Sequence, residues 1–323
     1  MNLFVIRCLN KGRAIYTQEG GSAFPTHLKT VKAFDYEGQA ASDQVKSLIS
    51  APGPCMVSRL GHNELQAISV YLTIHNDRRY LDKFYDYLTG RSGWFWWDKS
   101  LINAMQIGAG FFPATPDLLS KFCIKMLDDI ALIDLLGAWL PGESFLTELQ
   151  QAIRVPLIDL EPYVHANPWS AALANRTVLV IHPFVESIRS QFSRRHLLFK
   201  DQRILPEFEL KTIKVIQSHA GDKVNFPSWF DAFEYMCKKN DQTNFDIALI
   251  GAGAYGLPLA VHIKRIGKKA IYLGGATQIL FGIRGSRWDD RPFYQTLFNP
   301  YWVRPQSCER PQNADLVERA CYW

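Results

Sequence analysis

The spacing of apolar and polar residues changes along the chain and separates a mostly helical stretch from an alternating one. Between residues 80 and 150 the apolar positions recur every three or four residues, the period of an amphipathic helix. Two loops that contain proline, at 112–116 and 140–143, interrupt this stretch. We therefore expect residues 80–150 to be largely helical. The positions that carry the period include Leu118, Leu119, Phe122, Met126 and Leu127, and then Ile130, Ile133, Leu136 and Leu140.

From about residue 155 onward, short apolar runs alternate with amphipathic segments. The runs are continuous and rich in β-branched residues, which is typical of parallel strands covered on both faces. Alternation of this kind predicts an α/β fold with a Rossmann-like, mostly parallel sheet and helices on both faces. We expect strands over 55–60, 155–160, 177–182, 210–215, 245–250 and 269–273, and helices over 187–199, 229–239, 255–266 and 277–281.

The chain has 323 residues, enough for one large α/β domain or two small ones. The sequence shows no internal repeat and no low-complexity segment. We predict a single α/β domain over residues 51–288, in which the helical stretch 80–150 is an insertion after the first strand–helix unit. Residues 1–50 are then an N-terminal extension packed on the core, and residues 289–323 are a C-terminal aromatic tail.

The net charge and its distribution along the chain limit the kinds of ligand that the protein is expected to bind. The net charge is +5, with no run of five or more Lys and Arg residues, which argues against nucleic acid. A mild positive charge suits a ligand that carries phosphate, or a weak peripheral association with an anionic membrane surface.

The six cysteines form no C-x-x-C pair, and no Cys/His group has zinc-ligand spacing. We expect free thiols in a reducing compartment. The sequence contains no apolar stretch long enough to span a membrane. The predicted location is therefore the cytoplasm.

Residues 247–256 read I-A-L-I-G-A-G-A-Y-G, so a predicted strand ends in the G-x-G-x-x-G spacing of a dinucleotide-binding loop. Such a site needs an acid about 20 residues further on to hold the ribose, but the next strand ends in Leu273-Gly274-Gly275. We therefore expect no NAD. Two interpretations stay open: a tight structural turn, or a loop that binds another phosphate or sugar ligand. The predicted binding residues of this loop are Gly251, Gly253, Tyr255 and Gly256.

A second group of polar residues follows the predicted strand 55–60. Arg59 could hold a phosphate or carboxylate through two hydrogen bonds, beside Gly61. His62 and Glu64 lie two residues apart in the turn, where they could bind a divalent metal or act as acid and base. The alternative is a structural Arg59–Glu64 pair with an exposed His62.

His182 ends the predicted strand 177–182 and is either a ligand-binding group or a histidine satisfied within its own loop. The strand 269–273 leads into a second glycine-rich turn, and two arginines and a tryptophan follow it closely. Together these residues suit a pyrophosphate and a stacked base or sugar, and the alternative is an ordinary surface loop. The candidates are Gly274, Gly275, Gln278, Arg284, Arg287 and Trp288.

Three further patterns bear on the function. The aromatic run at 94–98 favours a seam between helices over a platform for an acceptor sugar. No G-x-S-x-G elbow is present, so Ser-His-Asp catalysis has no support. Nucleotide binding through a P-loop lysine has none either.

The order of these motifs resembles the GT-D-type glycosyltransferases over about residues 51–285. That family carries R-F-G-D-G-E near its start, and here Arg59, Gly61 and Glu64 match while His62 replaces the first acid. The closing segment is similar as well, through Asp246, Leu249, the glycines that follow and Leu259-Ala260. The strand 269–273 departs from the family, because it ends in two glycines without the expected Asp.

The resemblance implies a hexosyltransferase of bacterial surface polysaccharide or glycoprotein glycan synthesis. Such an enzyme moves a sugar from a nucleotide diphosphate sugar to a glycan or lipid-linked acceptor at the inner face of the membrane. It also implies a divalent metal, Mn or Mg, with His62 and Glu64 as ligands. Either Glu64 or His182 would be the catalytic base. The alternatives are a nucleotide- or sugar-binding protein without catalysis, and an NAD(P)-dependent oxidoreductase.

Overall fold

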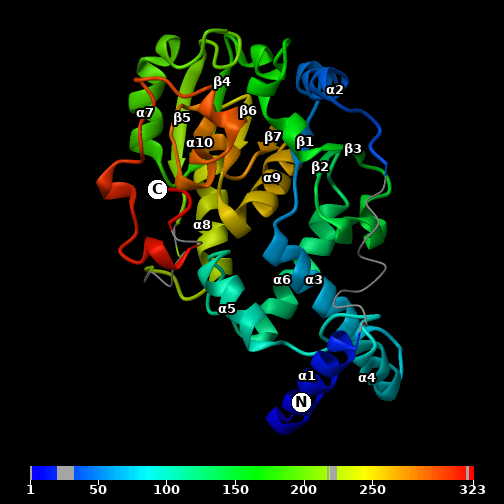
Figure 1. The fold of residues 1–323 in the computed structure, drawn as a ribbon. Helices are drawn as coiled ribbons and strands as arrows, with labels where there is room; N and C mark the ends of the chain where they lie inside the picture. Colours follow the sequence, from blue (N-terminus) through cyan, green and yellow to red (C-terminus); the bar gives the residue numbers. More distant parts are fainter. Residues whose placement is uncertain (1, 20–32, 217, 219–223, 318–319) are drawn as a thin grey trace.

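The computed structural model describes residues 2–19, 33–216, 218, 224–317 and 320–323. Its centre is a seven-stranded sheet with the order β3-β2-β1-β7-β6-β4-β5 (Figure 1). Every pair of neighbouring strands is parallel. The predicted Rossmann-like α/β fold is therefore confirmed.

The strands are short, and three of them are buried along their whole length. In β1, β2 and β6 every residue is buried, because helices cover both faces of the sheet. β4 pairs with β5 over six residues, the longest register in the sheet. The strands are β1 Cys55–Ser58, β2 Leu135–Ala138, β3 Ile153–Pro156, β4 Thr177–His182, β5 Glu209–Lys214, β6 Ile247–Ile250 and β7 Lys269–Tyr272.

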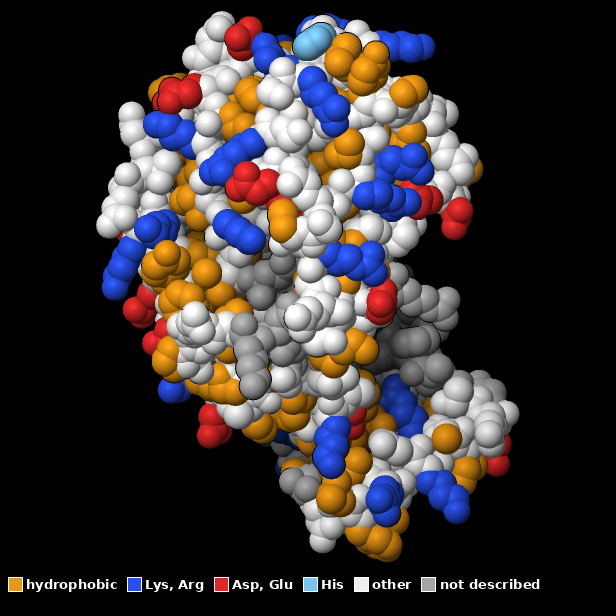
Figure 2. Space-filling view, turned by 90° about the vertical axis from the view of Figure 1, so that its left-hand side faces the viewer, with side chains coloured by type: hydrophobic (Ala, Val, Ile, Leu, Met, Phe, Trp, Pro, Cys, Tyr) orange, Lys and Arg blue, Asp and Glu red, His pale blue; other side chains and the backbone are white. Residues whose placement is uncertain are grey.

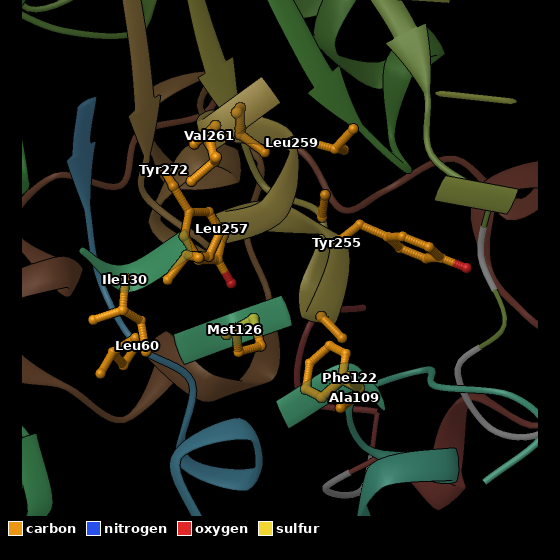
Figure 3. Packing of buried hydrophobic residues seen from close by; sticks show 14 of the residues in the cluster. Leu60, Ala109, Phe122, Met126, Ile130, Tyr255, Leu257, Leu259, Val261 and Tyr272 are labelled. Carbon is orange, nitrogen blue, oxygen red and sulfur yellow. The ribbon is translucent and has the colours of Figure 1, made fainter. Parts of the chain in front are cut away.

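Helices pack on both faces of the sheet, each face with its own apolar core. The first face carries α3 His62–His75, α5 Lys99–Ile107, α6 Pro116–Ile130, α8 Trp229–Asp241 and α9 Gly256–Arg265. The second face carries α2 Gln39–Ser50, α7 Val185–Ser193, α10 Ala276–Leu280, α11 Ser286–Asp289 and α12 Pro292–Gln295. Figure 3 shows the first core at the end of β7, with Tyr272, Leu257, Met126 and Ile130 packed together.

Short 3₁₀ segments make most of the remaining connections. They are η2 Pro141–Phe145, η3 Thr147–Leu149, η4 Leu157–Leu160, η5 Pro162–Val164, η6 Trp169–Leu173, η7 Arg195–Leu197, η9 Gly253–Tyr255, η10 Ser307–Glu309 and η11 Ala314–Leu316.

Two helices stand apart from the sheet. α1 Leu3–Gln18 packs on α4 Tyr80–Leu88 at the lower end of the molecule (Figure 1). They share a small apolar cluster with the aromatic run 94–98, in which Phe95 and Trp96 are buried. Those two rings thus lie in a seam between helices, the favoured interpretation of that run.

The helical prediction for 80–150 is wrong at β2. The Leu-Leu-Gly-Ala run is buried on both faces, so it shows no alternation, and its residues have no β preference. Gly137 explains the close packing: a Cβ there would lie 2.4 Å from Leu160 Cδ1. The strand expected over 155–160 begins earlier, ends at Pro156 and continues as η4, since proline has no N–H to extend the ladder.

The connections that follow neighbouring strands leave toward opposite faces of the sheet. α9 follows β6 onto the first face, whereas α7 follows β4 and α10 follows β7 onto the second. Where adjacent connections diverge in this way, a parallel sheet leaves a crevice at its carboxyl edge, the usual place of a ligand site.

Candidate functional site

A pocket of about 630 Å³ lies at this edge, over the carboxyl ends of β1, β7, β6 and β4. Two glycines form its floor. A Cβ on Gly274 would lie 3.0 Å from Arg59 Nη1, and one on Gly251 would lie 2.5 Å from His182 Cδ2 and 2.8 Å from the Gly274 carbonyl oxygen. Arg59, the two glycine backbones and His182 therefore form a continuous row across four strands.

The guanidinium of Arg59 is held in a fixed orientation. Its Nε and Nη2 donate to the carbonyl oxygen of Leu60 at 3.2 and 2.7 Å, and its Cζ lies 5.0 Å above the ring of Trp139. The Trp139 indole N–H donates to the same oxygen at 2.9 Å. Trp139 lies just beyond β2, so the helical prediction for this stretch hid its place in the site.

The buried ion pair of Glu143 and Arg154 holds the backbone of Trp139. Glu143 accepts a hydrogen bond from the Trp139 backbone N–H at 3.2 Å and lies 3.7 Å from Arg154 Nη2. Burial raises the pKa of Glu143 to about 7, against the opposing attraction of Arg154. The orientation of Arg59 thus rests on Trp139 and, through it, on Glu143.

Glu64 lies in the first turn of α3 and folds back over Gly61, the residue before the helix. A Cβ on Gly61 would lie 1.9 Å from Glu64 Oε2, so this approach requires glycine. The Glu64 side chain is buried, and burial raises its pKa, with smaller opposing contributions from its own backbone N–H, Arg59 and His62. A carboxylate with a raised pKa in a pocket is a candidate acid or base.

The metal prediction rests on few donors. His62 is exposed, Glu64 is buried, and the described part of the chain contains no group of three or more His, Cys, Asp or Glu side chains arranged around one point. Magnesium sites often use one or two carboxylates together with substrate phosphates. An ion held by His62 and Glu64 would take its other ligands from the substrate or from water.

His182 is a hydrogen-bond donor in this arrangement. Its Nδ1 accepts the Phe184 backbone N–H at 3.0 Å, which assigns the ring proton to Nε2. Burial lowers the pKa of His182 to about 3, so the ring is neutral at physiological pH. The one in-plane lone pair of the ring, on Nδ1, is then used, and His182 can offer the Nε2–H to a ligand but no free lone pair to act as a base.

The C-terminal segment forms the outer wall of the pocket. Gln278, on α10, donates to the carbonyl oxygen of Tyr322 at 3.1 Å, which joins this wall to the floor. The buried carboxylate of Glu161 lies in the same wall and accepts a hydrogen bond from the Tyr294 hydroxyl at 2.7 Å. Burial raises the pKa of Glu161. The residues after α10 that line the pocket are Arg287, Trp288, Arg291, Tyr294, Tyr322 and Trp323.

Sequence reasoning missed Glu161, Tyr294 and Trp139. Glu161 follows η4, after the strand predicted over 155–160, so its position near a strand end was the one available signal. Tyr294 and its neighbours belong to a segment without strands. Nothing in the local sequence pattern of this segment indicates that the segment folds over the sheet.

Most predicted site residues do meet in this pocket, but three do not. Tyr255 is buried in the core and stacks on Trp229 with ring centroids 4.9 Å apart, pointing away from Tyr272 in Figure 3. Gly256 backs onto the Tyr272 ring, and Arg284 forms an ion pair with Asp289 at 3.1 Å. Those lining the pocket are Arg59, Gly61, His62, Glu64, His182, Gly251, Gly253, Gly274, Gly275, Gln278, Arg287 and Trp288.

The surface and the comparisons add little to this geometry. Lys and Arg side chains are interspersed with Asp and Glu on the face shown in Figure 2. Among the described helices, none is long and apolar enough to cross a membrane. Comparison of the chain with protein-family models, curated proteins and solved structures gave no significant match. The chemistry of the site therefore has to be argued from its own residues.

Proposed function

We propose that the protein is a glycosyltransferase that moves a sugar from a nucleotide diphosphate sugar to a hydroxyl group of an acceptor. One observation carries this proposal. A fixed arginine, a floor of glycine backbone and a buried carboxylate line the same pocket at the carboxyl edge of a parallel sheet. This combination supplies an anion site and a base side by side. It also agrees with the motif resemblance to GT-D-type enzymes.

The leaving diphosphate gains charge as the glycosidic bond breaks, and fixed donors in the pocket stabilise that charge. Arg59 is the principal one, because its hydrogen bonds to Leu60 hold its orientation before the substrate binds. The glycine floor lets phosphate oxygens approach the backbone closely. Arg287 lines the same pocket and adds positive charge.

The acceptor hydroxyl needs a base, and the geometry favours Glu64 over His182. The neutral His182 already uses Nδ1 as an acceptor, whereas burial raises the pKa of Glu64 and so makes its carboxylate a stronger base. In the proposed step the acceptor oxygen bonds to the anomeric carbon and its proton passes to Glu64. The bond from the anomeric carbon to the diphosphate oxygen breaks, and its electron pair leaves with the nucleotide. His182 donates Nε2–H to the bound donor.

The aromatic wall suits the flat parts of the donor. Trp288 lies near both Tyr294 and Tyr322, with ring centroids 6.3 and 6.2 Å apart. Faces of this kind stack on a base or on the apolar side of a sugar ring. We place the nucleoside or sugar against this wall and the diphosphate at Arg59. The acceptor we propose is a glycan or lipid-linked glycan of a bacterial surface polysaccharide or glycoprotein.

Glu64→Gln provides the direct test. In a panel of UDP and GDP sugars, the wild-type protein should be stabilised against heat by one donor and should release its nucleotide when an acceptor is added. Glu64→Gln should keep the thermal shift and lose turnover by at least about 100-fold, the usual contribution of a general base. Glu234→Gln, at an exposed site on α8, serves as the matched control.

Three outcomes would contradict this proposal in different ways. Full turnover in Glu64→Gln removes Glu64 as the base. Tight nucleotide binding with no transfer to any acceptor indicates a binding protein without catalysis. Stabilisation by NAD(P)H alone indicates an oxidoreductase.

A further inference from the structure

Exposed apolar side chains are concentrated on α1 and α4, far beyond their share of the chain. Seven of the sixteen exposed large hydrophobic residues in the described structure lie on these two helices. They include the two most exposed, Leu81 at 79 % and Phe4 at 72 %. A set gathered in this way indicates an interaction surface, whereas single exposed apolar residues need no explanation. The others are Leu3, Ile15, Tyr16, Tyr80 and Tyr85.

α1 has two apolar sides with different partners. Its inner side meets α4 through the buried Leu9, with Val5 and Ile6 packed beside it. On the outer side, Phe4 and Ile15 lie eleven residues apart, close to three full turns, so they fall on one stripe of the helix. The outer stripe is therefore not the side that builds the small core.

The charges of α1 are all positive. Arg7 and Lys11 are exposed on the same outer side as Phe4 and Ile15, and the helix contains no acidic residue. Arg13 turns inward instead and donates to the carbonyl oxygens of Tyr87 and Ser92. The outer stripe thus combines exposed apolar side chains with two flanking cations.

α4 adds apolar surface without adding net negative charge. Its two acids are both paired: Asp82 with Arg79 at 3.0 Å and Asp86 with Arg78 at 2.5 Å. Leu81 and Tyr85 are four residues apart and so lie on one face of α4. The lower end of the molecule in Figure 2, where α1 lies in Figure 1, shows hydrophobic side chains among Lys and Arg.

We propose that the surface formed by α1 and α4, which we call the α1–α4 surface, docks on an anionic lipid bilayer. Apolar side chains flanked by Lys and Arg are the pattern by which a helix lies in a membrane interface, and the cations favour anionic headgroups. The docking is peripheral: the rings and Leu81 enter the headgroup boundary while the chain stays on one side. This proposal is independent of the transferase chemistry.

The small apolar cluster beneath the α1–α4 surface is connected to the pocket by α5. α5 begins at Lys99, immediately after the aromatic run that completes the small core, and ends at Ile107 beside Gly108 and Ala109 of the pocket wall. A helix of nine residues spans only about 14 Å. Docking through the α1–α4 surface would therefore hold the pocket close to the lipid headgroups.

Flotation of the purified full chain with vesicles tests the proposal. We expect binding to phosphatidylglycerol-containing vesicles at low salt, at least about tenfold weaker binding to pure phosphatidylcholine, and loss of binding as salt is raised. The double variant Phe4→Ser/Leu81→Ser should lose at least about tenfold in vesicle binding, because its apolar contacts are gone. Arg7→Gln/Lys11→Gln should lose the preference for anionic lipid.

The matched control is Leu316→Ser, since Leu316 is 59 % exposed on η11, outside both helices. It should float like the wild type. Circular dichroism and thermal denaturation report whether each variant is folded. No binding by the wild type, or equal binding by the folded Phe4→Ser/Leu81→Ser variant, would overturn the proposal. A lipid-independent dimer that this variant dissolves would also overturn it, because a second copy would then cover the surface.

Discussion

Glu64 shows how one side chain can be set for chemistry by its surroundings. Burial raises its pKa, while Arg59 and His62 nearby limit the rise. A base works only when deprotonated, so turnover should fall as pH drops through the raised pKa of Glu64. We expect the acid limb of the kcat profile to lie above about 4.3, the ordinary pKa of glutamate. An acid limb at or below that value would show that Glu64 does not titrate in the reaction.

Gly251 is the residue of the pocket floor at which an added side chain would meet the closest contacts. The Cβ of Gly251→Ala would meet the His182 ring and the carbonyl oxygen of Gly274, both of which are fixed. We expect a loss of about 1–3 kcal/mol in the free energy of unfolding, as for other overpacked sites, together with weaker donor binding. Thermal denaturation and donor titration measure the two effects.

Gly93→Ala is the control for that substitution, because nothing lies within 4 Å of a Cβ built on Gly93. It should leave both stability and donor binding close to those of the wild type. If Gly251→Ala behaved in the same way, the packing of the floor would be looser than the structure indicates.

The sequence identified the residues at strand ends better than those that support them. Arg59, Gly251 and His182 were predicted because each follows an apolar run that parallel sheets bring to one edge. The protonation of His182 was not predictable, because it depends on one backbone N–H in the fold. Its role as donor rather than base follows from the structure alone.

At the scale of elements, continuous apolar runs predicted strands well where β-branched residues dominate. The run 177–182 coincides with β4, and those over 245–250 and 269–273 contain β6 and β7. β2 was missed because Leu, Gly and Ala suit a helix equally well or better, and because burial on both faces removes any alternation. Only pairing with β1 and β3 makes it a strand.

The connection after β2 is the element that orients Arg59, through Trp139. Trp139→Ala removes both the ring beneath the guanidinium and the hydrogen bond to Leu60. We expect a loss of about 0.5–2 kcal/mol in donor binding, or roughly 2- to 30-fold in KM, with a smaller change in kcat. Trp139→Phe keeps an aromatic face, so its KM for the donor should lie between those of the wild type and Trp139→Ala. Steady-state kinetics with varied donor would detect this order, and an unchanged KM in both variants would contradict it.

For the molecule as a whole, one buried carboxylate ties the C-terminal segment to the start of α7. Glu309 accepts hydrogen bonds from the backbone N–H groups of Glu186 and Ser187 at 2.8 and 3.3 Å, and another from the Ser187 hydroxyl. Glu309→Ala leaves these groups at the start of α7 without their acceptor. We expect a loss of about 1–3 kcal/mol in the free energy of unfolding.

The same substitution should also raise KM for the donor, because the segment anchored by Glu309 carries Arg291 and Tyr294 at one end and Tyr322 at the other. Glu207→Ala is the control: its side chain is 82 % exposed and touches a different part of the surface. Wild-type stability in Glu309→Ala would show that other contacts hold the segment.

The participation of this segment in the pocket was beyond sequence reasoning. Residues 289–323 contain no strand among their described positions, and their apolar residues have no single period. An aromatic tail could be recognised there, but its path across the sheet depends on contacts such as Glu309 with α7 and Gln278 with Tyr322. Long-range contacts of this kind leave no local signature in the sequence.

The strand order also has a consequence for how the chain is made. β7 lies between β1 and β6, and Cys55 pairs with Lys269. The edge of β1 that later pairs with β7 therefore stays open until more than two hundred residues after Cys55 have left the ribosome. Pairings between such distant segments form slowly, and an uncovered strand edge invites aggregation meanwhile. Folding of this protein during synthesis should thus depend on a chaperone that shields the edge of β1 until β7 has been made.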